Sequence, residues 1–207
     1  MSIKNRRGLP LIFGGLLLIV AALSLVGYNL YTSWRGQQAT ETALEQLLPE
    51  IPQPPEEDQV AAEPEYPDYV LNPEMDMPLR KVDDLDYVAT LTIPGLELEL
   101  PIIDQWSYHN LRFAPCRYSG SAYLDNMVIC AHNFSKHFGH LLELSSGDPL
   151  SLMDMDGNIF NYQVVELEIL QPTDIELMTS GDWDLTLFTC TVGGRTRIAL
   201  RCERIND

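Results

Sequence analysis

The amino-acid sequence predicts an all-β domain, either a barrel or a sandwich, behind one N-terminal transmembrane helix. Beyond residue 86, short runs rich in β-branched and aromatic residues alternate with turn signals such as Pro94-Gly95 and Asp156-Gly157. Upstream, residues 9–26 carry no charge and are almost all apolar or glycine. These two patterns predict a membrane-spanning segment, a polar connection and one folded domain.

The apolar segment 8–31 is long enough, as a helix, to cross a hydrocarbon core of ~30 Å. Lys4, Arg6 and Arg7 precede it, which favours a cytoplasmic tail at 1–7 and an extracytoplasmic remainder. A cleaved signal peptide is the alternative, but the run is longer than a typical signal and no clean Ala-x-Ala site follows. We therefore expect a single-pass protein of the cell membrane.

Residues 32–79 are expected to form an extracytoplasmic stalk. Segment 37–48 favours a short juxtamembrane helix that Pro49 would end. From there to Pro78, prolines and acidic residues recur, and such a composition favours an extended chain that cannot fold alone. A lid formed by residues 64–78 is an alternative for part of this stretch.

The folded domain is expected to occupy residues 80–207, enough to bury one core. We expect strands near residues 87–94, 97–103, 121–124, 127–132, 149–154, 158–170, 184–190 and 195–203. Short helices are expected near 110–113 and 137–144. The glycine-containing connection 192–194 would bring the ends of the last two strands to one edge of the sheet.

The charge of the chain excludes one class of partner. Of the 207 residues, all 30 acidic ones lie beyond position 40, together with only nine basic ones, a net charge of −21 for that part. Because a domain with this much negative charge repels the phosphate backbone of nucleic acids, we expect no nucleic-acid binding.

Three residues at predicted strand ends suit covalent acyl transfer. Cys190 ends an apolar strand, Arg197 opens the next, and His132 closes an earlier apolar run. A thiolate would be the nucleophile, a guanidinium would stabilise the oxyanion, and an imidazole would move the proton. Each residue also has a purely structural alternative: a buried core cysteine, a surface arginine paired with a carboxylate, and a histidine whose hydrogen bonds are satisfied within the protein. Strand alternation alone cannot choose Arg197 over Arg195 and Arg201, which share its face.

These motifs resemble those of the sortases, the cysteine transpeptidases of Gram-positive bacteria. The run Thr186-Leu187-Phe188-Thr189-Cys190 matches the family's Thr-Leu-x-Thr-Cys. Ala131-His132 resembles its strand-closing histidine, and Arg197 precedes three apolar residues as the family's arginine does. The resemblance spans roughly residues 87 to 204. It implies a closed β-barrel of about eight strands with one or two short helices, and Cys190, His132 and Arg197 as catalytic residues.

The resemblance also implies a function. A sortase of this kind would cleave a C-terminal Leu-Pro-x-Thr-Gly-like sorting signal of a secreted protein through a thioacyl intermediate. It would then transfer that protein to an amine, such as a peptidoglycan cross-bridge or a pilin lysine. In sortases, the connection corresponding to residues 171–184 shapes the groove for the signal. Residues expected to contact the substrate are Thr189, Pro172, Ile175 and Leu177.

Other interpretations stay open from the sequence. One is a cysteine peptidase or hydrolase with the same Cys-His pair, and another is a non-enzymatic surface scaffold. A zinc domain would use Cys130 with His132, His137 and His140, but their spacing fits no closed zinc site, so we expect neither metal nor cofactor. The remaining cysteines could form at most one disulfide or could all be small buried residues; they are Cys116, Cys130 and Cys202.

Overall fold

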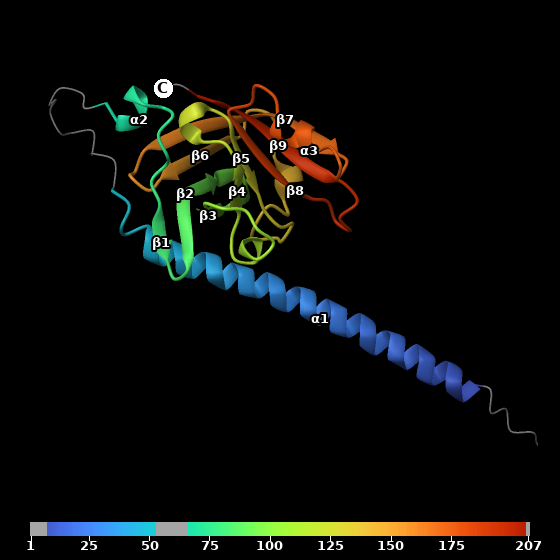
Figure 1. Cartoon of the computed structure of the whole chain (residues 1–207). Coiled ribbons are helices and arrows are strands. Elements are labelled where there is room, and N and C mark those ends of the chain that lie inside the picture. Colours follow the sequence, from blue (N-terminus) through green and yellow to red (C-terminus); the bar gives the residue numbers. More distant parts are fainter. Residues whose placement is uncertain (1–7, 53–65, 206–207) are drawn as a thin grey trace, which may run out of the picture.

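A long N-terminal helix and a β-barrel packed against its C-terminal half make up the described chain (Figure 1). The computed structural model describes residues 8–52 and 66–205. The predicted tail at 1–7 and much of the proline-rich stretch, residues 53–65, lie outside the described residues.

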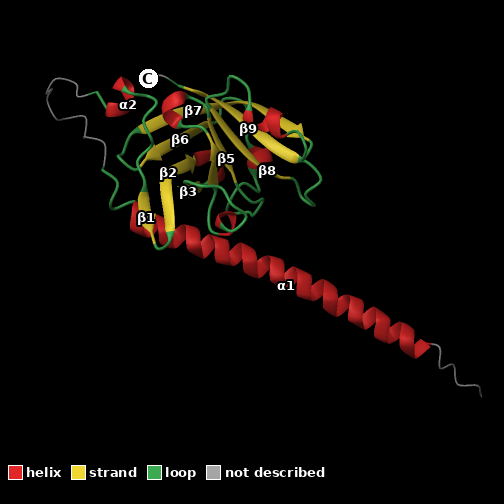
Figure 2. Cartoon of the chain, viewed as in Figure 1, coloured by secondary structure: helices red, strands yellow, loops and turns green. Residues whose placement is uncertain are grey.

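The barrel contains eight strands in a closed ring, with a ninth strand added at its edge (Figure 2). The strands are β1 (Arg80–Val82), β2 (Leu85–Ile93), β3 (Leu98–Ile103), β4 (Cys116–Ser119), β5 (Met127–Cys130), β6 (Pro149–Asp154), β7 (Ile159–Leu170), β8 (Leu185–Cys190) and β9 (Arg197–Arg204). Their order is β1-β2-β3-β4-β5-β8-β9-β7-β6, and pairing of β2 with β6 closes the ring. The predicted closed barrel of about eight strands is confirmed.

Short helices occupy several of the connections. They are α2 (Asp68–Leu71), α3 (Ile175–Thr179) and the 3-10 turns η1 (Pro94–Leu96), η2 (Asn110–Arg112), η3 (Ala122–Leu124) and η4 (Leu141–Glu143). The strand predicted at 121–124 is wrong, because this segment is η3. There, the Ser121 hydroxyl accepts a hydrogen bond from the Tyr123 N–H, and Asp125 adopts a left-handed φ of 49°. The nearby strand is β4, which the sequence did not reveal.

Alternate residues of each strand fill the barrel. On β8, Leu185 and Leu187 are fully buried in the main core, and Leu200 on β9 packs with them. This period of two is what the β-rich sequence texture predicted. The residues between them point to the outer face of the sheet, the face on which Cys190 lies.

Helix α1 (Gly8–Leu47) is one uninterrupted element, so the predicted span and juxtamembrane helix are continuous. Its apolar N-terminal part is not buried by the described residues, and its composition and length suit a membrane span. Further on, four residues at helical spacing are buried against the barrel: Gly36, Thr40, Ala43 and Leu47. The packed unit therefore begins near residue 36, upstream of the expected boundary at residue 80.

The segment around α2 packs beside the start of β5. The ring of Tyr69 stacks on Tyr123 with centroids 4.6 Å apart, and Met77 enters the core with 3% of its surface exposed. Tyr123 precedes β5, whereas the predicted active-site residues follow β5 and end β8. Described residues 66–78 thus lie at the opposite end of these strands from Cys190.

Candidate active site

The predicted residues Cys190, His132 and Arg197 lie at three neighbouring strand ends. Cys190, the last residue of β8, is the direct antiparallel partner of Arg197, the first residue of β9. Strands β5 and β8 run parallel, with Cys130 level with Phe188, so the same register places His132 level with Cys190. Adjacent strands lie about 4.8 Å apart. The barrel therefore brings all three residues together, with the cysteine in the middle.

Hydrogen bonds just beyond the strands maintain this register. The Ala131 N–H donates to the Phe188 carbonyl at 3.2 Å, and the Asn133 side-chain amide donates to the Thr191 carbonyl at 3.3 Å. On the other side, the Thr191 N–H donates to the Thr196 carbonyl at 3.0 Å, which closes the connection between β8 and β9. These bonds hold the loops that flank the cysteine.

Arg197 is half-buried and carries an unneutralised charge among the described residues. Its Nη1 donates to the carbonyls of Gly194 at 3.2 Å and Thr196 at 3.1 Å, and it forms no ion pair with a described carboxylate. Those two bonds orient the guanidinium and leave its other N–H groups for a ligand. A positive charge in this position suits stabilisation of an oxyanion on a carbonyl beside Cys190.

Arg201 has a different task, although it shares a strand face with Arg197. It is 2% exposed, and its Nε lies 2.7 Å from the Glu168 carboxylate. Its Nη1 donates to Thr186 Oγ1 and the Met178 carbonyl, and its Nη2 donates to the Leu177 carbonyl. Arg201 therefore fastens α3 to the outer face of β8 and β9. No sequence signal distinguished this role, because it depends on partners up to 33 residues away.

His132 is half-buried, with its ring 4.8 Å from that of Phe134. Burial, together with the positive charge of Arg112, lowers the pKa of this imidazole below its usual 6.5. The ring is therefore neutral near pH 7 and can accept a proton from a thiol.

The other two histidines of this segment have separate environments. His137 is fully buried, and this burial lowers its pKa to about 4. His140 is exposed and pairs through Nδ1 with the Glu143 carboxylate at 2.6 Å.

Three of the four candidate substrate contacts lie on the connection before β8. Ile175 and Leu177 on α3 are 52% and 56% exposed, and Pro172 is half-buried in the preceding turn. Thr189 differs, because it is 1% exposed and its hydroxyl donates to the Ala131 carbonyl at 2.9 Å. Its side chain ties β8 to β5 within the barrel.

The remaining cysteines contrast with the half-buried Cys190. Cys116, Cys130 and Cys202 are free and buried. Burial raises the pKa of Cys116 and of Cys202 to about 12, and it raises that of Cys130 still further. Because the thiolate is the nucleophilic form, these three thiols are poor nucleophiles.

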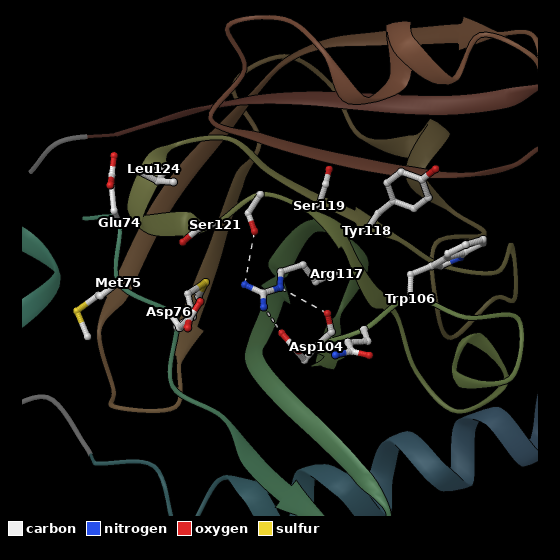
Figure 3. Close-up of a pocket in the computed structure, with 13 residues that line it drawn as sticks. Glu74, Met75, Asp76, Asp104, Trp106, Arg117, Tyr118, Ser119, Ser121 and Leu124 are labelled. Carbon is white, nitrogen blue, oxygen red and sulfur yellow. Dashed lines mark hydrogen bonds and ion pairs between the residues drawn. The ribbon is translucent and has the colours of Figure 1, made fainter. Parts of the chain in front are cut away.

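A hollow of about 560 Å³ lies elsewhere, between the α2 segment and β4 (Figure 3). Its lining includes Glu74, Asp76 and Trp106 but none of the three predicted catalytic residues. Arg117 within it is held by an ion pair to Asp104. The two charges therefore neutralise each other within the hollow.

Comparison with known proteins identifies the family of the domain. The sortase domain family matches residues 91–205, more than half of the chain. No curated protein is similar enough in sequence to count as a relative.

Solved sortases share the fold. Sortase C of Streptococcus pneumoniae is 25% identical with a TM-score of 0.52, over 61% of this chain and 72% of its own. Sortase D5 of Clostridium perfringens is 20% identical with a TM-score of 0.51, over 58% of this chain and 80% of its own. Sortase C1 of the group B Streptococcus pilus island 1 is 23% identical with a TM-score of 0.51. The match covers 57% of this chain and 64% of that protein. With its sortase domain and its sortase barrel, the chain belongs to the sortase family.

Proposed function

We propose that this sortase is a membrane-anchored cysteine transpeptidase in which Cys190, His132 and Arg197 act on a peptide bond. The observation that carries the proposal is the shared register of the three strand ends. A nucleophile between a proton acceptor and an uncompensated cation has the components that acyl transfer needs. The apolar exposed part of α1 supports the anchor.

The proposed cycle begins at the carbonyl carbon before the scissile bond. The Cys190 sulfur attacks this carbon while His132 takes the thiol proton, and Arg197 stabilises the oxyanion. When the oxyanion collapses, the C–N bond breaks and His132 gives its proton to the leaving amine. An incoming amine then attacks the thioacyl carbon, loses its proton to His132 and forms the new amide. The thiol is regenerated.

The outer face of β8 and β9 supplies a binding surface for the sorting signal. Phe188 and Ala199 pack with Met178 of α3 beside the cysteine. The exposed side chains of Ile175 and Leu177 project from the same helix. An apolar residue of a Leu-Pro-x-Thr-Gly-like signal would contact these leucine and isoleucine side chains.

The acceptor is proposed to be a primary amine of the cell wall or of a pilin. The sortase C of S. pneumoniae is described in connection with pilin substrate specificity, so a pilin lysine is the acceptor to test first. A peptidase with the same Cys-His pair would transfer the acyl group to water instead.

The test uses the full chain in nanodiscs with a library of Leu-Pro-x-Thr-Gly-type peptides, with and without added amine. We expect an amine-linked product from the wild type and none from Cys190→Ala. Formation of the free acid alone, at every amine concentration, would instead identify a hydrolase. Equal product from wild type and Cys190→Ala would refute the proposed nucleophile.

A further inference from the structure

The way α1 meets the barrel sets the distance of the barrel from the membrane. Gly36 is buried, and a Cβ added there would lie 3.1 Å from the Arg112 carbonyl oxygen and 3.6 Å from the Phe134 ring. One turn on, the Thr40 hydroxyl donates to the Phe113 carbonyl at 3.1 Å. The loops after β3 and β5 therefore touch the first part of α1 that leaves the apolar segment.

Trp34 marks the expected level of the lipid headgroups. It is 57% exposed and follows the apolar segment, as interfacial aromatic residues do. Gly36 comes two residues later, which is about 3 Å along the helix axis. Because α1 is unbroken there, the barrel loops in contact with Gly36 lie at the headgroup level rather than on a long stalk.

The exposed side chains of these loops suit that position. Tyr108 is 76% exposed, and Trp106, which also lines the hollow beside Glu74 and Asp76, is 39% exposed. Their ring centroids lie 5.4 Å apart. Arg112 and Lys136 are also exposed. We call these four residues the membrane-facing patch. Aromatic rings mixed with cations are typical of protein surfaces at membrane interfaces.

The two basic side chains of the patch have no carboxylate partner among the described residues, although the domain is acidic. Five of its nine basic side chains pair with carboxylates: Arg80, Lys81, Arg117, Arg201 and Arg204. Among the described residues, neither Arg112 nor Lys136 pairs with an acid. Arg195 and Arg197 near Cys190 lack a described carboxylate partner as well. The two unpaired cations of the patch give this part of an otherwise acidic domain a local positive charge, which is complementary to an external anion.

We propose that the membrane-facing patch rests on the headgroups of anionic lipids and holds the active site at the membrane surface. This inference rests on the membrane anchor of the proposed function. It includes the active site because Phe134, which contacts Gly36, packs on His132. The substrate would therefore be acylated beside the membrane from which it emerges.

The three tryptophans of the chain provide the test. Single-tryptophan variants of the full chain, with Phe at the other two positions, are placed in nanodiscs that contain phosphatidylglycerol and a lipid spin-labelled on its headgroup. Trp34 reports insertion of the anchor, and Trp106 reports contact of the patch. Trp183 precedes β8, at the opposite end of that strand from Cys190, and serves as the distant control.

We expect strong quenching of Trp34, clear quenching of Trp106 and little quenching of Trp183. Arg112→Glu combined with Lys136→Glu should lower Trp106 quenching to the Trp183 level. Lys81→Glu should have no effect, because Lys81 lies on β1, which packs near the far end of α1.

Three results would contradict the inference in distinguishable ways. Quenched Trp34 with Trp106 no more quenched than Trp183 would leave the anchor in place and remove the contact. Unquenched Trp34 would remove the anchor as well. Equal quenching of Trp106 in nanodiscs of phosphatidylcholine alone would show membrane contact without selection for anionic lipid. It would refute the proposal that Arg112 and Lys136 bind anionic headgroups.

Discussion

At each end of the outer face of β8 and β9, an arginine of β9 faces a polar residue of β8, but the surroundings of the two arginines differ. At one end, Thr186 and Arg201 are cross-strand partners, and the arginine is buried under α3 with its donors engaged. Four residues away, Cys190 and Arg197 are cross-strand partners and remain half-buried, without a described carboxylate beside the guanidinium. The difference is that α3 covers Arg201 and engages its donors, whereas the guanidinium of Arg197 keeps N–H groups that could bind a substrate.

The largest expected effect separates the half-buried thiol of Cys190 from the three fully buried thiols. Cys190→Ala should abolish amine-linked product while leaving the thermal unfolding midpoint nearly unchanged, because the side chain lies at an open strand end. The control is Cys202→Ala, which should keep turnover and lose about 1 kcal/mol of stability. Turnover and thermal unfolding are measured on the same preparations. Loss of activity in both variants would contradict the contrast.

Exchange of the two arginines for alanine should separate rate from stability. Arg197→Ala should lower kcat/KM by about 10²–10³-fold, since one oxyanion donor is lost, and should leave the unfolding midpoint unchanged. Arg201→Ala should instead lower the free energy of unfolding by about 2–4 kcal/mol, because Glu168 and two α3 carbonyls lose their partner. Steady-state kinetics and chemical denaturation measure the two effects. If Arg197→Ala were the less stable variant, the assignment would be reversed.

A smaller effect is expected at the surface of α3. Leu177→Ala should reduce kcat/KM for the peptide by about 5–30-fold, which corresponds to about 1–2 kcal/mol, as apolar contact with the sorting signal is lost. Leu142 on η4 provides the control, because it is 55% exposed against 56% for Leu177. Leu142→Ala should therefore leave the kinetics unchanged. Similar losses in both variants would show that α3 does not bind the signal.

The smallest effect concerns the acid limb of the pH profile. Only the neutral form of His132 accepts a proton, and its pKa is lowered, so kcat/KM should stay high at pH 6.5 and fall as the pH drops further. Arg112→Gln removes a nearby charge that lowers this pKa, so the limb should move to higher pH. Arg80→Gln, which loses a distant cation paired with Asp156, should not move it. A limb unaffected by Arg112→Gln would argue against His132 as the titrating base.

The alternation of β-forming runs and turn residues predicted an all-β barrel or sandwich, and the resemblance to sortases selected the closed barrel. Leu185 and Leu187 fill the core as the alternation of side chains along a strand requires. The sequence predicted two separate helical segments, 8–31 and 37–48, where the structure has one continuous helix. The helix face that contains Gly36 and Thr40 becomes buried only when the barrel packs on it. The predicted strand at 121–124 failed because the Ser121 cap favours a tight 3-10 turn.

For the site, local pattern placed Cys190 and His132 at strand ends but could not show that the ends meet. That depends on parallel pairing of β5 with β8, which joins residues 58 positions apart. The role of Arg201 was equally invisible, because it is set by α3 and Glu168 rather than by its own strand.

The most direct measurement is to trap the acyl-enzyme intermediate and to identify by mass spectrometry which cysteine carries the acyl group. The wild-type chain is mixed with a reactive sorting-signal peptide without amine, quenched in acid, digested and analysed by mass spectrometry for the acyl mass on each of the four cysteines. We expect the adduct on Cys190 alone, and no adduct in Cys190→Ala. An adduct on Cys116, Cys130 or Cys202, or one that persists in Cys190→Ala, would contradict this expectation.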